Sequence, residues 1–149
     1  MAAAPANPQQ PLINTWLGQL VGTMVLAGVV MVFFRTGIEG WKGIDAKWQL
    51  YALYAGVAAI IPALLYLTNF KQVLDVDRAA QQANGGRPDP AIRKVLVRAL
   101  TVGGALCELP QSFGVLHLLL GGETRWFLGA TMVTIALRLS YRPFERKPR

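Results

Sequence analysis

Residues 20–34 read LVGTMVLAGVVMVFF, and residues 52–67 read ALYAGVAAIIPALLYL. Neither stretch carries a charged side chain, whereas a surface helix of a soluble protein shows a polar stripe with a 3.6-residue period. A helix needs about 20 apolar residues to cross the ~30 Å hydrocarbon core of a bilayer. The two stretches therefore predict membrane-spanning helices. The alternative is a soluble protein with four buried helices.

Around these stretches, the apolar residues of the chain form four segments, at about 15–34, 48–69, 95–120 and 125–141. The composition agrees with membrane insertion, because 53% of residues are hydrophobic and only 15% are charged, against about a quarter charged in soluble domains. We expect an all-α, polytopic membrane protein. Its single domain, residues 1–149, would have four transmembrane helices arranged as two antiparallel hairpins.

The 15 Lys and Arg residues favour one orientation of these spans. Most of them lie in the connection 70–92, at the start of the third span, or at the end of the fourth span and after it. Cytoplasmic loops of membrane proteins carry an excess of Lys and Arg. We therefore expect a protein of the bacterial inner membrane, with this connection and both termini on the cytoplasmic side. The net charge of +7 is thereby explained without a nucleic-acid partner.

Residues that favour helix ends flank the four segments. Asn14 and Asp45 are candidate caps of the first two spans, and Asp89, which precedes a proline, is a candidate cap of the third. The stretch 84–86, Asn-Gly-Gly, is a stop signal, so the second helix is expected to continue past the bilayer to about residue 83. Two glycines at 121–122 predict a tight turn, after which Glu123 or the next residue would cap the fourth span.

Small residues recur at helical spacing on several spans and indicate close helix packing. Gly18 and Gly22 form a small-xxx-small pair on the first span. The second span carries a stripe of small residues at 52, 56, 59 and 63, which includes Gly56 and Ala59. Gly104 and Gly114 lie on the third span. These faces either pack within the chain or contact a partner subunit. Pro62 predicts a kink in the second span, since proline removes a backbone hydrogen bond.

Polar side chains within the third and fourth spans form the candidate site. Residues 108–117 read ELPQSFGVLH, and an ionisable group at this depth usually faces protein or water and has a partner. Glu108 precedes Glu123 by fifteen residues and Arg138 follows it by fifteen, so an antiparallel hairpin would bring them to similar depth. We expect a polar cluster of Glu108, Gln111, Thr134 and Arg138. Alternatively, Arg138 extends to the headgroups while Glu108 is protonated or bonds Gln111. His117 should face away from Glu108.

Residues 108–116, ELPQSFGVL, resemble the ion-binding helix of the rotary ATPase proteolipid family, in which Glu is followed five residues later by Phe or Tyr and then Gly. The resemblance implies that Glu108 binds an ion. The chain differs from that family in its central loop, which is over 20 residues long, and in the position of Glu108 in the third of four spans. The whole chain is similar to small uncharacterised four-span bacterial membrane proteins.

The sequence shows no catalytic constellation, metal site or cofactor motif. Cys107 and His117 are the only cysteine and histidine, and neither has a second ligand at metal-binding spacing. We expect a non-catalytic accessory or structural subunit of a larger membrane complex, in contact with lipid and with other subunits or copies of itself. The alternative is an oligomeric transporter that translocates a proton or cation through Glu108. A membrane-bound enzyme is a third hypothesis.

Overall fold

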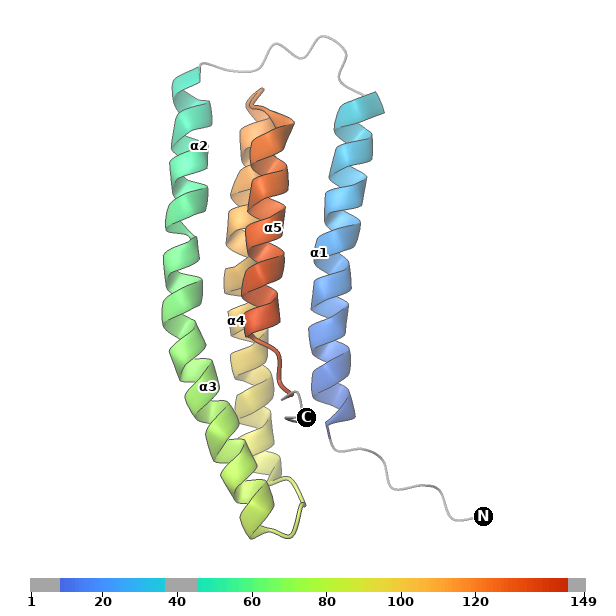
Figure 1. The fold of residues 1–149 in the computed structure, drawn as a ribbon, viewed down its shortest axis with the longest axis vertical. Coiled ribbons are helices and arrows are strands. Elements are labelled where there is room, and N and C mark those ends of the chain that lie inside the picture. Colours follow the sequence, from blue (N-terminus) through green and yellow to red (C-terminus); the bar gives the residue numbers. More distant parts are fainter. Residues whose placement is uncertain (1–8, 37–45, 145–149) are drawn as a thin grey trace, which may run out of the picture.

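The helices account for all of the regular secondary structure in the computed structural model, which describes residues 9–36 and 46–144. They are α1 (Gln10–Thr36), α2 (Ala46–Ala58), α3 (Ile60–Ala83), α4 (Pro90–Leu119) and α5 (Thr124–Ser140). They lie along a common direction, with α4 and α5 between α1 on one side and the rod formed by α2 and α3 on the other (Figure 1). The predicted all-α class is confirmed for these residues.

The second predicted span is one long rod that is interrupted at Ala59, between α2 and α3. Pro62 explains the interruption, because it has no N–H to donate to the carbonyl of Ala58, four residues earlier. The rod continues to Ala83, as the sequence predicted. Asn84 is the C-cap of this helix, and the two glycines after it have φ angles of 62° and 86°, which other residues rarely adopt.

The other helix ends agree with the sequence in part. Asp89 caps α4, since its carboxylate accepts hydrogen bonds from the backbone N–H groups of residues 91 and 92 at 2.8 and 3.4 Å. The prediction for Asn14 was wrong, because α1 begins at Gln10 and places Asn14 inside the helix. Glu123 precedes α5 without a side-chain cap and instead pairs with Arg125 at 2.5 Å. Residue 45 lies outside the described ranges.

The small-residue stripe of the second span is the surface on which α2 and α3 pack against α4. Ala52, Ala59 and Ala63 are buried there. At Gly56 a β-carbon would lie 3.2 Å from the β-carbon of Phe113, so the glycine lets the two backbones approach closely. This stripe therefore stabilises contacts within the chain.

The remaining glycine sites differ from one another. Gly104 lies against the side chain of Gln19 on α1, and Gly114 lies against Ala130 on α5. Gly18 and Gly22, in contrast, are exposed on α1, and a β-carbon added to either would have no atom within 4 Å. These two glycines make no helix contact within the described part of the chain.

The outer surface of the bundle is apolar. Among the described residues, two segments are long and apolar enough to cross a membrane: Gln10–Phe34 and Ala46–Ala83. Only 11% and 17% of the residues in their most apolar windows are buried. α4 and α5 are not among these segments: α5 has 17 residues, and α4 carries the polar residues Glu108 and Gln111. The bundle thus exposes apolar side chains and encloses polar ones.

Candidate functional site

Glu108 of α4 and Arg138 of α5 form an ion pair in the interior of the bundle. The short turn at 121–122 makes α4 and α5 an antiparallel hairpin, so residues equally distant from the turn lie at the same depth. The side chain of Arg138 is 4% exposed and that of Glu108 is 32% exposed. The contact expected from the sequence is therefore present, and Arg138 does not extend away from the bundle.

Helix α1 completes this cluster with two side chains that the sequence analysis did not include. Gln19 accepts a hydrogen bond through Oε1 from Arg138 Nη1 at 3.0 Å. Thr23, which is fully buried, lies with Oγ1 3.1 Å from Glu108 Oε1 and can donate to it. The indole N–H of Trp16 donates to the backbone carbonyl of Arg138 at 2.9 Å. Three helices thus converge on one ion pair.

The α1 residues carry a signal that sequence reasoning could have used. Trp16, Gln19 and Thr23 are spaced three and four residues apart, so they share one face of a helix. They are the side chains with hydrogen-bonding groups on that face of α1, which is otherwise rich in aliphatic residues. A polar stripe on an apolar span indicates the face directed at protein.

Gln111 joins α4 to α1 and α5 and does not bond Glu108. Its Nε2 donates to the carbonyl of Thr23 at 3.1 Å and lies 3.4 Å from Thr131 Oγ1. Thr134 is fully buried on α5, and its hydroxyl has no hydrogen-bond partner among the described residues. Glu108 and Arg138 therefore form the ion pair, and Gln111 is linked to it through Thr23, whose carbonyl accepts from Gln111 and whose hydroxyl lies beside Glu108.

The geometry of this cluster favours a structural role over a chemical one. The carboxylate of Glu108 is neutralised by a guanidinium and has a hydroxyl at hydrogen-bond distance, so it is poorly placed to abstract a proton or bind a cation. Within the described ranges, no group of three or more His, Cys, Asp or Glu residues could hold a metal ion.

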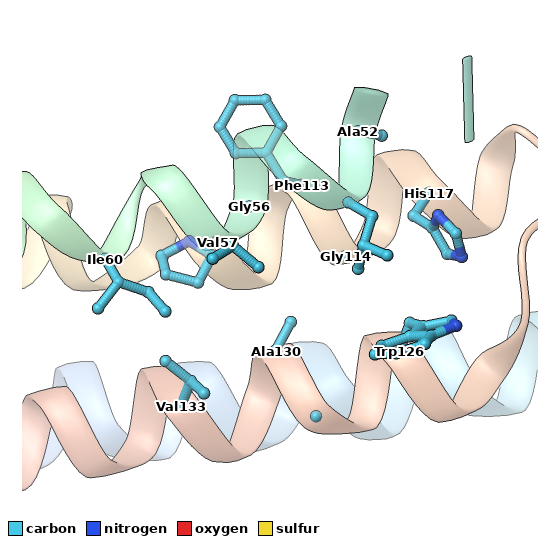
Figure 2. Close-up of a pocket in the computed structure, with 13 residues that line it drawn as sticks. Ala52, Gly56, Val57, Ile60, Phe113, Gly114, His117, Trp126, Ala130 and Val133 are labelled. Carbon is cyan, nitrogen blue, oxygen red and sulfur yellow. The ribbon is translucent and has the colours of Figure 1, made fainter. Parts of the chain in front are cut away.

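A separate apolar pocket of about 240 Å³ lies between α2, the start of α3, α4 and α5, with His117 and Trp126 at one end (Figure 2). Aliphatic and aromatic side chains dominate its lining, among them Ile60, Phe113 and Val133. His117 is 5% exposed, and its Nδ1 lies 3.0 Å from the backbone carbonyl of Gln49. His117 is therefore held away from Glu108, as predicted.

The contact with Gln49 fixes the tautomer of His117. A carbonyl oxygen only accepts hydrogen bonds, so Nδ1 carries the hydrogen and Nε2 presents a lone pair in the neutral ring. Nε2 is buried and has no hydrogen-bond partner among the described residues. Nε2 lies beside Gly122 of the turn, which is outside the pocket lining, so the pocket itself offers an apolar surface.

No protein-family model, curated protein or solved structure matches this chain. The similarity of residues 108–116 to the proteolipid ion-binding helix therefore stays a prediction.

Proposed function

We propose that the chain is a multi-pass membrane protein in which four helical rods cross the bilayer: α1, the α2–α3 rod, α4 and α5. The observation that carries the proposal is the apolar outer surface of α1 and the α2–α3 rod. Leu65, Val29 and Val32 are more than 60% exposed. Monomeric soluble proteins rarely expose contiguous apolar patches larger than a few hundred Å².

A soluble four-helix protein is the competing interpretation, and burial argues against it. The core helices of soluble proteins are mostly buried, whereas 11% and 17% of the most apolar windows of these two rods are buried. The polar residues are distributed the opposite way, with Gln111, Thr134 and Arg138 inside. Ionisable groups of membrane proteins face the bundle interior and pair with one another, so the ion pair of α4 and α5 is compatible with their crossing the bilayer.

For the biochemical role, we favour a non-catalytic accessory or structural subunit of a membrane complex. The Glu108–Arg138 pair and its hydrogen bonds to α1 stabilise the interior of the bundle. We therefore place the contacts with other subunits on the outer surface. Gly18 and Gly22 form an open, small-residue face on α1. Such a face allows another transmembrane helix to approach closely, as expected for contact with another subunit or a second copy of the chain.

The alternative, an oligomer that translocates a proton or cation through Glu108, is favoured by one observation. The Glu108 side chain is 32% exposed, so part of the carboxylate faces outward from the bundle. Translocation would require Arg138 to release the carboxylate in each cycle. The pairing therefore favours the structural role.

Membrane insertion and orientation are tested with single cysteines in a Cys107→Ser background. We expect the protein to remain in the membrane pellet after alkaline carbonate extraction. A cysteine at Glu123 should react with an impermeant thiol reagent from the periplasm, and one at Asn84 should react only after lysis. The opposite labelling would contradict the orientation, and recovery in the soluble fraction would contradict the membrane assignment itself.

The subunit role is tested by the mass of the native complex in mild detergent. We expect the full chain to elute with other membrane polypeptides or as an oligomer. A Gly18→Leu/Gly22→Leu double variant should dissociate while keeping its helical content, because both side chains would point away from the rest of the bundle. Gly129→Leu is the matched control, since a β-carbon added to this exposed glycine on α5 would also have no atom within 4 Å. A strictly monomeric parent would overturn the subunit proposal.

A further inference from the structure

A hollow of about 530 Å³ lies where α5 ends and α3 continues. α5 stops at Ser140, whereas the α3–α4 hairpin projects well beyond it (Figure 1). One wall is a face of α3, from Leu67 to Arg78, and the other is formed by residues 139–144. We call this space the basic hollow.

Part of the basic hollow is lined by hydrophobic side chains, among them Leu67 on α3 and Leu139 on α5. Aromatic residues hold this wall in place. Phe70 packs on Tyr141 with ring centroids 5.2 Å apart, and Phe144 packs edge-on against Trp16 at 5.4 Å. The apolar part of the hollow is therefore well ordered by packing.

The lining of the hollow also carries cationic side chains. Lys71, Arg78 and Arg142 contribute three positive charges, and Asp75 is the acidic residue in the lining. Asp75 is 72% exposed and pairs with Arg78 at 3.3 Å. The lining thus keeps an excess of positive charge after this pair is counted, and Lys71 and Arg142 are exposed.

We propose that the basic hollow binds an anionic phospholipid, with the headgroup phosphate against Lys71 and Arg142 and the upper acyl chain against Leu67 and Leu139. On α3 the sequence changes from apolar to charged between Phe70 and Lys71, so the hollow spans the boundary between hydrocarbon and headgroups. The inference rests on the proposed membrane location, with this end of the bundle in the cytoplasm.

Charge and shape select this ligand over a free phosphate compound. Basic residues near the cytoplasmic surface attract anionic lipids, and basic pockets between transmembrane helices bind their headgroups. An arginine guanidinium can also bind phosphate oxygens through two hydrogen bonds. A small soluble anion would leave the apolar wall unused, whereas a lipid covers both walls of the hollow.

The test is native mass spectrometry of the full chain in mild detergent, with phosphatidylglycerol or phosphatidylcholine of identical acyl chains as probes. We expect phosphatidylglycerol to bind preferentially. Lys71→Gln/Arg142→Gln should weaken its binding by about tenfold or more, because both removed charges attract the anionic headgroup. Lys71→Arg/Arg142→Lys, which keeps both charges, should bind close to the parent.

The matched control is Arg87→Gln/Lys94→Gln, which removes the same charge from exposed positions of the hairpin outside the hollow. It should bind phosphatidylglycerol like the parent. Equal losses in both double variants would indicate diffuse attraction and overturn the proposal. Displacement of the lipid by millimolar inorganic phosphate would indicate a free-anion site and overturn it as well. A membrane-integrated protein without lipid preference refutes the basic hollow alone, whereas a soluble protein refutes the proposed function.

Discussion

Replacing Glu108 by glutamine removes the charge that neutralises Arg138, whose side chain is 4% exposed. An arginine guanidinium is always charged in proteins, and in this variant it is left with neutral acceptors, the amide oxygens of Gln19, at 3.0 Å, and of the new glutamine. Breaking a buried ion pair from one side costs about 3–5 kcal/mol. Glu108 is about one-third exposed, and solvent screening reduces this value, so we expect a loss of about 2–3 kcal/mol.

The reverse substitution, Arg138→Gln, should cost less. The carboxylate left behind is partly exposed, has the Thr23 hydroxyl within 3.1 Å and can take up a proton. Unfolding by sodium dodecyl sulfate in mixed micelles, followed by circular dichroism, would measure the free energies of both single variants and of the double variant. The double variant should lose less than the sum of the single variants, with a coupling energy of about 1–2 kcal/mol for groups in direct contact.

Glu123→Gln is the matched control, because Glu123 pairs with Arg125 at the surface, where both side chains are more than half exposed. Its loss should stay below about 1 kcal/mol. A stabilising role of the Glu108–Arg138 pair is refuted if Glu108→Gln costs no more than this control, or if the two single losses at the buried pair simply add. Labelling of Glu108 by a hydrophobic carbodiimide, together with loss of pH-dependent flux in Glu108→Gln, would support ion translocation instead.

Three further predictions concern local packing. A β-carbon at Gly104 would lie 2.5 Å from Gln19 Oε1, so Gly104→Ala should lower the free energy of unfolding by about 1–3 kcal/mol. At Gly129 a β-carbon would have nothing within 4 Å, so Gly129→Ala should be neutral or stabilise by up to ~1 kcal/mol. Equal thermal midpoints of the two variants would contradict this prediction. Asp89→Ala removes the cap of α4 and should cost about 1 kcal/mol, with faster amide hydrogen exchange in the first turn, and unchanged exchange there would argue against the cap. In ¹⁵N-histidine-labelled protein, the neutral form of the single imidazole, His117, should be the Nδ1–H tautomer, and an Nε2–H spectrum would contradict its contact with the α2 carbonyl.

Local chemistry carried the sequence predictions that the structure confirms. Helix ends depend on a few neighbouring residues, so the stop after Ala83 and the cap at Asp89 could be predicted from the residues themselves. Asn14 failed as a cap because α1 gains a further turn at its start, where Leu12 is buried. A favourable side chain does not end a helix whose preceding turn is stabilised by tertiary packing.

The sequence by itself determined the helical segments and the depth at which Glu108 meets Arg138, because a short turn between antiparallel helices fixes their register. The tertiary structure alone decided what surrounds that pair. The lateral position of α1 brings Gln19 and Thr23 to the ion pair and leaves Gly18 outside. Which neighbour a helix face meets depends on packing among segments distant in sequence, because small residues and isolated polar groups suit a contact without specifying the partner.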